Sequence, residues 1–326
     1  MKNKLRLLSL LPALLLLLAG CGSESLLLQY TVNNTGTESI SSFVASDQTY
    51  RSEYSYKDIC VIPEKAVSYP SDMSFRSEGV LLINKTDNEM LLSKNIYGRL
   101  YPASLTKLAT ALVCLKYGNL DDTVIISYNA SHITEPGAKL CFLQEGDRVN
   151  FKTLLTSFLV YSGNDAGIAL AEHISGSETA FVELMNNELI KLGAVDTHFV
   201  NSHGLPDDNH YTTVYDMYLI INELLNYPVF NEIAAIDTYI AEFTDSTGKE
   251  VKKLYENTNQ YLIGLRKLPK GINITASKTG TTFAAGSCLI QAFTNKKDKT
   301  YIAVVMKAPD SNVLYNEMNS LLEKVN

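Results

Sequence analysis

Two short apolar runs separated by turn residues open the part of the chain that has the pattern of a packed domain, which begins near Lys57. They lie in the stretch GVLLINKTDNEMLLSKN, which starts at Gly79, with Thr86, Asp87 and Asn88 between them. Apolar runs of this length that are bounded by turn residues are typical of paired strands. The pattern therefore predicts a β-hairpin.

The next apolar segment, RLYPASLTKLATALVCL from Arg99 to Leu115, predicts a buried helix. Proline suits the first turn of a helix, where its missing N–H needs no partner, so we expect the helix to begin within a residue or two of Pro102. From Leu105 onward the apolar residues surround the helix axis and do not form a single stripe. This distribution is typical of a helix that is buried on all sides.

Three later segments add further elements. FLVYSGNDAGIALAEHI places Ser162, Gly163 and Asn164 in a short connection before a helical stretch, where they are expected to face a cavity. ITASKTGTTFAAGSCLIQAF and TYIAVVMKA, which start at Ile274 and Thr300, have the pattern of neighbouring strands.

The C-terminal stretch SNVLYNEMNSLLEKVN predicts one helix, with Ser311 or Asn312 as its cap, that packs back on the sheet. Together the elements predict an α+β fold. An antiparallel sheet of about five strands is covered by the terminal helices and lies beside a mostly helical region from about Leu100 to Leu265. The active site is expected at their junction, within one catalytic domain.

Composition and charge exclude one class of partner. The chain has 326 residues and a formal net charge of −7, with no run of lysine and arginine interleaved with aromatic residues. Nucleic-acid binding depends on such basic surfaces, so no nucleic-acid partner is expected. Besides Cys21, the cysteines are Cys60, Cys114, Cys141 and Cys288, which permit two disulfides without requiring any. None has the spacing of a zinc site, and we expect neither a metal nor a cofactor.

Ser104 and Lys107 carry the first candidate chemistry. Residues three apart on a helix share a face, so the amine of Lys107 can lie beside the hydroxyl of Ser104. Burial lowers the pKa of a lysine and makes its neutral amine accessible as a base, which activates a serine nucleophile. The same Ser-x-x-Lys pattern occurs at Ser246 to Lys249, but there it falls in a polar, turn-like stretch where an exposed lysine needs no explanation.

Two tripeptides follow the Ser-x-x-Lys pattern in a fixed order: Ser162 to Asn164, then Lys278 to Gly280. Each has an ordinary alternative explanation. Ser162 and Asn164 are good helix caps, and Lys278 could be a solvated residue at a strand end. Found in this order and each in the expected local setting, the three motifs are a specific signal.

On these motifs the chain resembles the serine penicillin-binding proteins, and within them the low-molecular-mass D-alanyl-D-alanine carboxypeptidases. The resemblance runs from about Gly79 to about Ala308 and includes PASLTKLATALV, SGNDAGIALAE, KTGTTFAAGSCL and, from Asn201, NSHGLPDDNHYTTVYDM. It implies a β-lactamase/transpeptidase-like fold. It also implies a serine D,D-carboxypeptidase that removes the terminal D-alanine from peptidoglycan stem pentapeptides through an acyl-serine intermediate and is inhibited by β-lactams.

The resemblance further implies the acylating residues. Ser104 would be the nucleophile and Lys107 would receive its proton. The backbone N–H groups of Ser104 and Thr281 would hold the oxyanion of the intermediate. Ser162 would relay a proton to the leaving D-alanine nitrogen.

The remaining motif residues would bind the substrate. Asn164 would hydrogen-bond the substrate backbone, and Lys278 would add positive potential near the terminal carboxylate. The hydroxyls of Thr279 and Thr281 would donate to that carboxylate, with Gly280 between them in the same binding segment.

The N-terminus predicts secretion. MKNKLRLLSLLPALLLLLAGCGSES has basic residues, then an apolar run that is short for a membrane span, which needs ~20 residues, then small residues. Leu18-Ala19-Gly20-Cys21 resembles the lipobox of bacterial lipoproteins. It implies residues 1–20 as a signal peptide, a lipid on Cys21 and an anchor on the outer face of the cytoplasmic membrane. Residues 21–56, rich in Ser, Thr and Asn, would form a tether to the catalytic domain at 57–326.

Several other functions stay open at this point. A D,D-endopeptidase or a β-lactamase would have the same fold, although neither ELMNN at Glu183 nor ELLN at Glu223 fits the E-x-x-L-N pattern of class A β-lactamases. A sensor lipoprotein that binds muropeptides or β-lactams without turnover would carry the same motifs. A Ser-His-Asp hydrolase is disfavoured because the chain has no G-x-S-x-G elbow.

The segment HGLPDDNH contains four possible metal ligands, which are His203, Asp207, Asp208 and His210. Their spacing matches no common zinc motif. The Gly-Leu-Pro-Asp core is more typical of a turn held by its own side chains, so we do not expect a metal site there.

Overall fold

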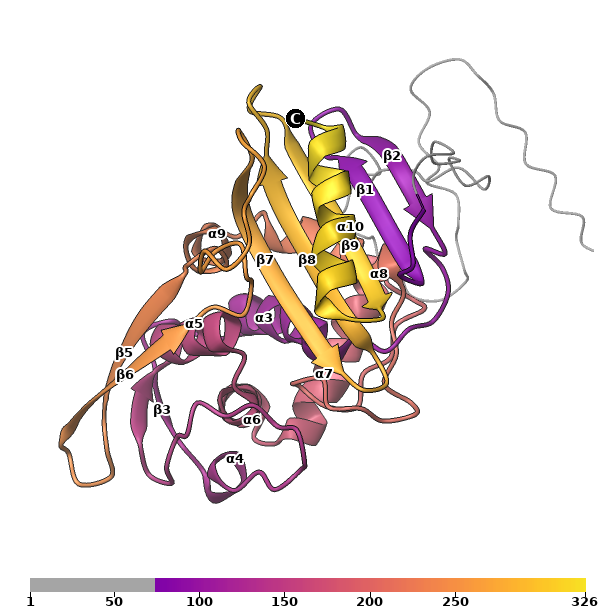
Figure 1. The fold of residues 1–326 in the computed structure, drawn as a ribbon. Helices are drawn as coiled ribbons and strands as arrows, with labels where there is room; N and C mark the ends of the chain where they lie inside the picture. Colours follow the sequence, from indigo (N-terminus) through magenta and orange to yellow (C-terminus); the bar gives the residue numbers. More distant parts are fainter. Residues whose placement is uncertain (1–73) are drawn as a thin grey trace, which may run out of the picture. The chain divides into compact units, whose positions relative to one another are not determined.

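The computed structural model describes residues 74–326; the predicted signal peptide, Cys21, the tether and the first residues of the predicted catalytic domain lie outside the described residues. Figure 1 shows an antiparallel sheet with the strand order β2-β1-β9-β8-β7. Its strands are β1 (Gly79–Asn84), β2 (Glu89–Lys94), β7 (Asn273–Thr282), β8 (Gly286–Thr294) and β9 (Thr300–Ala308). The predicted hairpin and the predicted sheet of about five strands are confirmed.

The sheet is covered on both faces, which explains why its inner strands β1, β8 and β9 are mostly apolar and almost completely buried. Val80 and Leu82 of β1 belong to the apolar cluster that includes the C-terminal helix α10 (Ser311–Lys324). Leu81 and Ile83 belong to the cluster formed with the helical region. Successive residues of a strand point to opposite faces, so a wholly apolar strand packs on both sides. Figure 1 shows α10 lying across one face of the sheet.

The C-terminal helix packs on the sheet as predicted, but its cap lies one residue before the predicted position. The carboxylate of Asp310 accepts a hydrogen bond from the N–H of Val313 at 2.9 Å. Asp310 still has an extended backbone, whereas Ser311 is already helical. The cap is the last non-helical residue, so the prediction of Ser311 or Asn312 is wrong.

The Ser-x-x-Lys segment begins as one 3-10 turn, η2 (Ala103–Leu105), and continues as α3 (Thr106–Tyr117). The prediction of a helix that starts next to Pro102 and is buried on all sides is confirmed, since every residue from Thr106 to Cys114 is buried. Only the tighter first turn differs from the prediction. The helices in contact with α3 are α5 (Phe151–Tyr161), α6 (Asn164–Ser175), α7 (Glu178–Leu192) and α8 (Val214–Leu224).

The helical region also contains a second antiparallel sheet, which the sequence pattern does not predict. Its order is β3-β4-β5-β6, with β3 (Thr123–Ile125), β4 (Arg148–Asn150), β5 (Thr238–Thr244) and β6 (Glu250–Glu256). Two of these strands are very short and the other two are largely exposed, so none has the apolar run of a buried strand. Ser246 and Lys249, the second Ser-x-x-Lys match, lie at the exposed turn of the β5–β6 hairpin.

The remaining helices of the described region, α4 (Tyr128–Ser131) and α9 (Pro228–Ile233), are short. Across residues 74–326, no helix combines the length and the apolar character needed to cross a membrane. Cys114, Cys141 and Cys288 are buried and have free thiols, while Cys60 lies outside this region.

Candidate active site

Ser104 lies in η2, at a point where three backbone segments approach one another closely. Ala103, just before it, has a φ of 48°, which is uncommon for a residue with a side chain. A Cβ atom at Gly204 would come within 2.0 Å of the carbonyl oxygen of Ala103, and one at Gly280 within 3.0 Å of the Ser104 nitrogen. Glycine suits both positions because the backbones around Ser104 leave no room for a side chain.

Lys107 is fully buried, and its Nζ atom has three oxygen neighbours. Nζ lies 3.0 Å from Ser104 Oγ, 2.8 Å from Asn164 Oδ1 and 2.6 Å from the carbonyl oxygen of His203. Amide and carbonyl oxygens only accept hydrogen bonds, whereas a serine hydroxyl also donates one. A neutral amine can therefore donate its two protons to Asn164 and His203. Its lone pair is then directed at the hydroxyl of Ser104.

The electrostatic environment also favours the neutral amine of Lys107. Burial holds the pKa of Lys107 well below its ordinary value of 10.5, and the nearby charge of Lys278 lowers this pKa further. The pKa of Lys278 is itself lowered to about 7, first by burial and then by the charge of Lys139. The Lys278 Nζ donates only to the carbonyl oxygen of its neighbour Thr279, at 3.2 Å, among the described residues.

Ser162 and Gly163 connect α5 to α6, and Asn164 is the first residue of α6. Ser162 has a left-handed backbone with a φ of 73°, and its buried Oγ has no hydrogen-bond partner among residues 74–326. The cap position of α6 belongs to Gly163, and Asn164 Oδ1 accepts from Lys107. Ser162 and Asn164 therefore do not cap this helix. Both line the cavity, as predicted.

A loop that the sequence analysis does not assign to the site packs against this connection. The carbonyl oxygen of Lys139 accepts from the N–H of Asn164 at 2.7 Å. The carboxylate of the buried Asp165 accepts from the N–H of Cys141 at 2.8 Å. These contacts bring the side chain of Lys139 into the site, where its Nζ lies 4.0 Å from the centroid of the Tyr161 ring.

The strand β7 is an edge of the five-stranded sheet, and its free edge meets η2. The N–H of Ser277 donates to the carbonyl oxygen of Ala234, outside the sheet, at 3.0 Å. Backbone groups of alternate residues in a strand point to the same side, and the pairing with β8 is regular from Ser277 to Thr282. The N–H groups of Thr279 and Thr281 therefore also point away from β8. That of Thr281 lies on the edge that meets η2.

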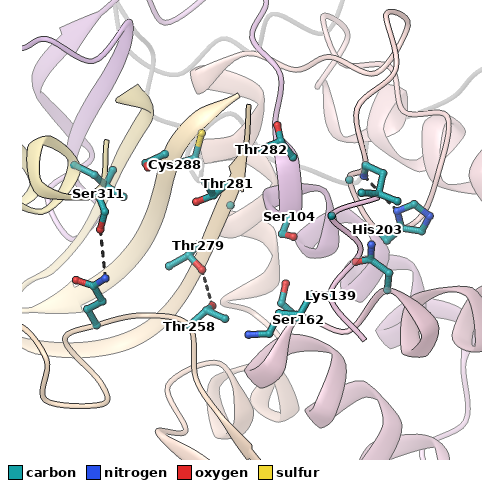
Figure 2. Close-up of a pocket in the computed structure, with 18 of the residues that line it drawn as sticks. Ser104, Lys139, Ser162, His203, Thr258, Thr279, Thr281, Thr282, Cys288 and Ser311 are labelled. Atoms are coloured by element: carbon teal, nitrogen blue, oxygen red, sulfur yellow. Dashed lines mark hydrogen bonds between the residues drawn. The ribbon is translucent and has the colours of Figure 1, made fainter. Parts of the chain in front are cut away.

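A cavity of about 340 Å³ opens in front of these groups. Six of the predicted site residues line it, which are Ser104, Ser162, Asn164, Thr279, Gly280 and Thr281. Lys107 and Lys278 are almost completely buried and do not line the cavity. Figure 2 shows Ser104 facing Thr279 and Thr281 across the cavity, with Thr279 bonded to Thr258 at 2.5 Å. No aspartate or glutamate of the described chain lines the cavity.

The HGLPDDNH segment supports the turn that carries Ser104. His210 Nδ1 accepts from the N–H of Val200 at 3.1 Å, so its Nε2 carries the proton and donates to Thr106 Oγ1 at 2.8 Å. Thr106 Oγ1 donates in turn to the carbonyl oxygen of Ala103. Burial lowers the pKa of His210 to about 3, which keeps the ring neutral. Within the described residues, the four possible metal ligands do not form a group that could hold an ion.

Several lining residues lie outside the three sequence motifs. Gly204 belongs to the segment from Asn201 that carries part of the resemblance, so a sequence signal for it exists. Lys139 and Thr258 belong to loops without a pattern of their own. Both are far from Ser104 in the sequence, and only the fold places all three around the same cavity.

Comparisons with known proteins agree with this geometry. The family profile described as D-alanyl-D-alanine carboxypeptidase matches residues 64–310. A D-alanyl-D-alanine carboxypeptidase of Bacillus subtilis is 34% identical, over 73% of this chain and 59% of its own length. One of Haemophilus influenzae is 33% identical, over 74% of this chain and 60% of its own. The chain thus spans about three fifths of the length of these curated relatives.

The fold matches solved structures over a larger share of their length. The DD-transpeptidase of Streptomyces K15 superposes with a TM-score of 0.72 at 26% identity. The superposition covers 78% of this chain and 98% of that one.

Proposed function

Because this chain belongs to the D-alanyl-D-alanine carboxypeptidase family, we propose that it is a serine D,D-carboxypeptidase acting on peptidoglycan stem peptides. The observation that carries the proposal is the contact of 3.0 Å between Lys107 Nζ and Ser104 Oγ, in a site that favours the neutral amine. The free edge of β7 and the hydroxyl of Ser162 lie on the same cavity and supply the other groups that acyl transfer needs.

Acylation begins when Ser104 Oγ attacks the carbonyl carbon between the two terminal D-alanines, while Lys107 takes the hydroxyl proton. The N–H groups of Ser104 and Thr281 donate to the oxyanion that forms on the former carbonyl oxygen. As the C–N bond breaks, a proton passes from Lys107 through the Ser162 hydroxyl to the leaving nitrogen. The Ser162 hydroxyl suits this transfer because it has no competing partner in the described region.

Deacylation returns the enzyme to its starting state. Water attacks the ester carbon, Lys107 accepts the water proton, and Ser104 leaves with that proton restored to its oxygen. The amide of Asn164 holds the peptide during both steps, whereas the hydroxyls of Thr279 and Thr281 bind the terminal carboxylate and release it with the leaving D-alanine.

A β-lactam would acylate the same serine, and we expect its adduct to persist. Class A β-lactamases use a glutamate to activate the deacylating water, and no carboxylate of the described residues lines this cavity. Glu183 and Glu223, the two glutamates considered from the sequence, both lie away from it. The site therefore favours slow release over efficient hydrolysis of the antibiotic.

The test follows the intact mass of the full chain after incubation with a penicillin, beside Ser104→Ala and Lys107→Ala variants. We expect a persistent adduct on the wild type alone, and release of D-alanine from a stem pentapeptide. Rapid loss of the antibiotic without an adduct would identify a β-lactamase, and no reaction of the wild type would identify a binding protein. Cleavage of a crosslinked dimer without release of D-alanine would identify an endopeptidase.

We also propose that the protein is a lipoprotein on the outer face of the bacterial cytoplasmic membrane. The support is the sequence Leu18-Ala19-Gly20-Cys21 after an apolar run with basic residues before it. Metabolic labelling with a fatty acid should mark the wild type and leave a Cys21→Ser variant unmarked. A secreted wild-type product without label would contradict the proposal.

A further inference from the structure

Lys139 is a cavity-lining lysine whose charge has no counterpart in the described chain. Its Nζ lies 4.0 Å from the centroid of the Tyr161 ring, and the ion pairs of residues 74–326 do not include it. Burial lowers its pKa. Lys139 is exposed and lines the cavity, so its ammonium can contact a negatively charged ligand that enters there.

A second lysine, Lys278, also favours an anion in this part of the cavity. Lys278 is 2% exposed, and among the described residues its Nζ donates a hydrogen bond only to the carbonyl oxygen of Thr279. The charge of Lys139 acts on Lys278 and lowers its pKa. Two ammonium groups therefore repel each other beside a cavity that no described carboxylate lines. An anion in the cavity would relieve this repulsion.

The position of Lys139 indicates which part of a substrate would supply the anion. Figure 2 shows Lys139 next to Ser162, on the side of the cavity where Thr258 and Thr279 lie. In the proposed reaction Ser162 donates to the nitrogen of the leaving D-alanine. In D-alanine a single carbon separates the nitrogen from the carboxylate. A cation next to Ser162 would therefore lie close to the terminal carboxylate in that reaction.

We propose that Lys139 binds the terminal carboxylate of the peptide and makes the site specific for substrates that end in a free carboxylate. This inference rests on the proposed function. The Thr279 hydroxyl, which donates to Thr258 Oγ1 in the free protein, would turn its proton to the same carboxylate, and the buried Lys278 adds positive potential. Of the two lysines, only Lys139 lines the cavity, so it is the one placed to contact the carboxylate directly and to set the preference for an anion.

The test compares two peptides with the same sequence, one ending in a free carboxylate and the other in a carboxamide. Cleavage of both by the full chain is followed by mass. Lys139→Gln should lower kcat/KM for the carboxylate peptide by about tenfold to a hundredfold, the usual range for a charge-assisted hydrogen bond. Its cleavage of the carboxamide peptide should stay within about twofold of the wild type. Lys139→Arg should keep most of the preference, and Lys249→Gln, at an exposed turn, should change neither value.

An equal fall of kcat/KM for both peptides would overturn the inference, because Lys139 would then act on the acyl part or on the shape of the site. No fall for either peptide would overturn it as well. If the wild type releases no D-alanine from any peptide, the proposed function fails separately. The inference is then decided by acylation with a penicillin and with its methyl ester. It requires Lys139→Gln to slow acylation by the free acid alone, and an equal effect on both would overturn it.

Discussion

Lys107 and Lys278 must hold opposite protonation states for the proposed reaction. Lys107 must be neutral to accept a proton, and its pKa lies well below 10.5. Lys278 must be charged to attract a carboxylate, and its pKa is about 7. We therefore expect kcat/KM to rise with pH as Lys107 loses its proton and to fall above about pH 7 as Lys278 loses its charge. The measurement is kcat/KM for D-alanine release from about pH 5 to about pH 10.

The Lys278→Arg variant is the control for this pH profile. A guanidinium keeps its charge throughout the range, so the alkaline fall should move to higher pH or disappear. An alkaline fall at the same pH in the variant would contradict the assignment of that limb to Lys278.

A substitution at Gly280 tests whether the close approach of β7 to Ser104 is needed for the reaction. In Gly280→Ala, the new Cβ would lie 2.9 Å from the carbonyl oxygen of Pro102 and 3.0 Å from the Ser104 nitrogen. Because both neighbours are backbone atoms, η2 and β7 must move apart, which displaces the N–H groups of Ser104 and Thr281 that are proposed to bind the oxyanion. We expect acylation by penicillin to slow by about tenfold or more, and the free energy of unfolding to fall by about 1–3 kcal/mol.

Thr275→Ala, on the same strand and outside the cavity, is the matched control for Gly280→Ala and should acylate at close to the wild-type rate. If Gly280→Ala acylates as fast as this control, the close approach of β7 to Ser104 does not matter for the chemistry.

Local spacing decides which site residues the sequence can predict. Ser104 and Lys107 are one helical turn apart, so their contact follows from the helix alone. The contact of Lys107 with the His203 carbonyl joins residues far apart in the chain, and no local pattern predicts it. The same holds for Lys139 and Thr258, whose loops have no periodicity.

At the scale of elements, the segment from Asn201 to Leu205 is held in place by helix α7. Ser202 donates from its N–H and its hydroxyl to Glu178 Oε1, at 2.9 Å and 2.7 Å. The next residue, His203, presents its carbonyl to Lys107. Glu178→Ala would leave two donors of Ser202 without a partner, which costs about 1–3 kcal/mol of stability. The segment would then be held less firmly, and the position of the His203 carbonyl beside Lys107 would be less well defined. We expect slower acylation by penicillin and a lower thermal midpoint.

Glu183→Ala is the matched control for Glu178→Ala, because Glu183 is an exposed glutamate of the same helix. It should change neither the acylation rate nor the thermal midpoint by much. Equal behaviour of the two variants would show that Glu178 does not position the segment.

The elements that the sequence predicts well are those with a strong apolar pattern. β1 and α3 are buried on all sides, and both are predicted close to their observed bounds. The β5–β6 hairpin is mostly exposed, so its pairing depends on backbone hydrogen bonds and on a turn, and its apolar signal is weak. The sequence also does not predict the tight first turn at Ala103, because this turn depends on packing against Gly204 and Gly280.

At the scale of the whole described region, the site forms where the five-stranded sheet meets the helical region. Lys278 and Thr281 come from the sheet, whereas Lys107 and Ser162 come from the helices. The apolar pattern predicts both parts and their shared cleft, but the distances across the cleft depend on how the two parts pack. Lys139, which the sequence analysis does not assign to the site, is an example: its loop is held beside the site by a contact with the first residue of α6.

Two buried histidines couple the stability of this region to pH. Burial lowers the pKa of His203 and His210 to about 3, whereas an unfolded histidine titrates near 6.5. Between these values the unfolded chain takes up protons that the folded chain does not. Folding stability should therefore fall as pH drops from about 6.5 towards about 3. The buried carboxyls of Asp165 and Asp216 act in the opposite direction, because burial raises their pKa.

A difference measurement separates the histidines from these carboxyls. His210→Gln removes one titrating ring, so its stability deficit relative to the wild type should shrink on acidification, by up to ~1.4 kcal/mol per pH unit. Urea unfolding of both proteins at several pH values measures this deficit, with the exposed His132→Gln as the matched control. The deficit shrinks because the wild type alone loses the contribution of a neutral His210. A deficit that stays constant with pH would mean that His210 is not held neutral by the fold.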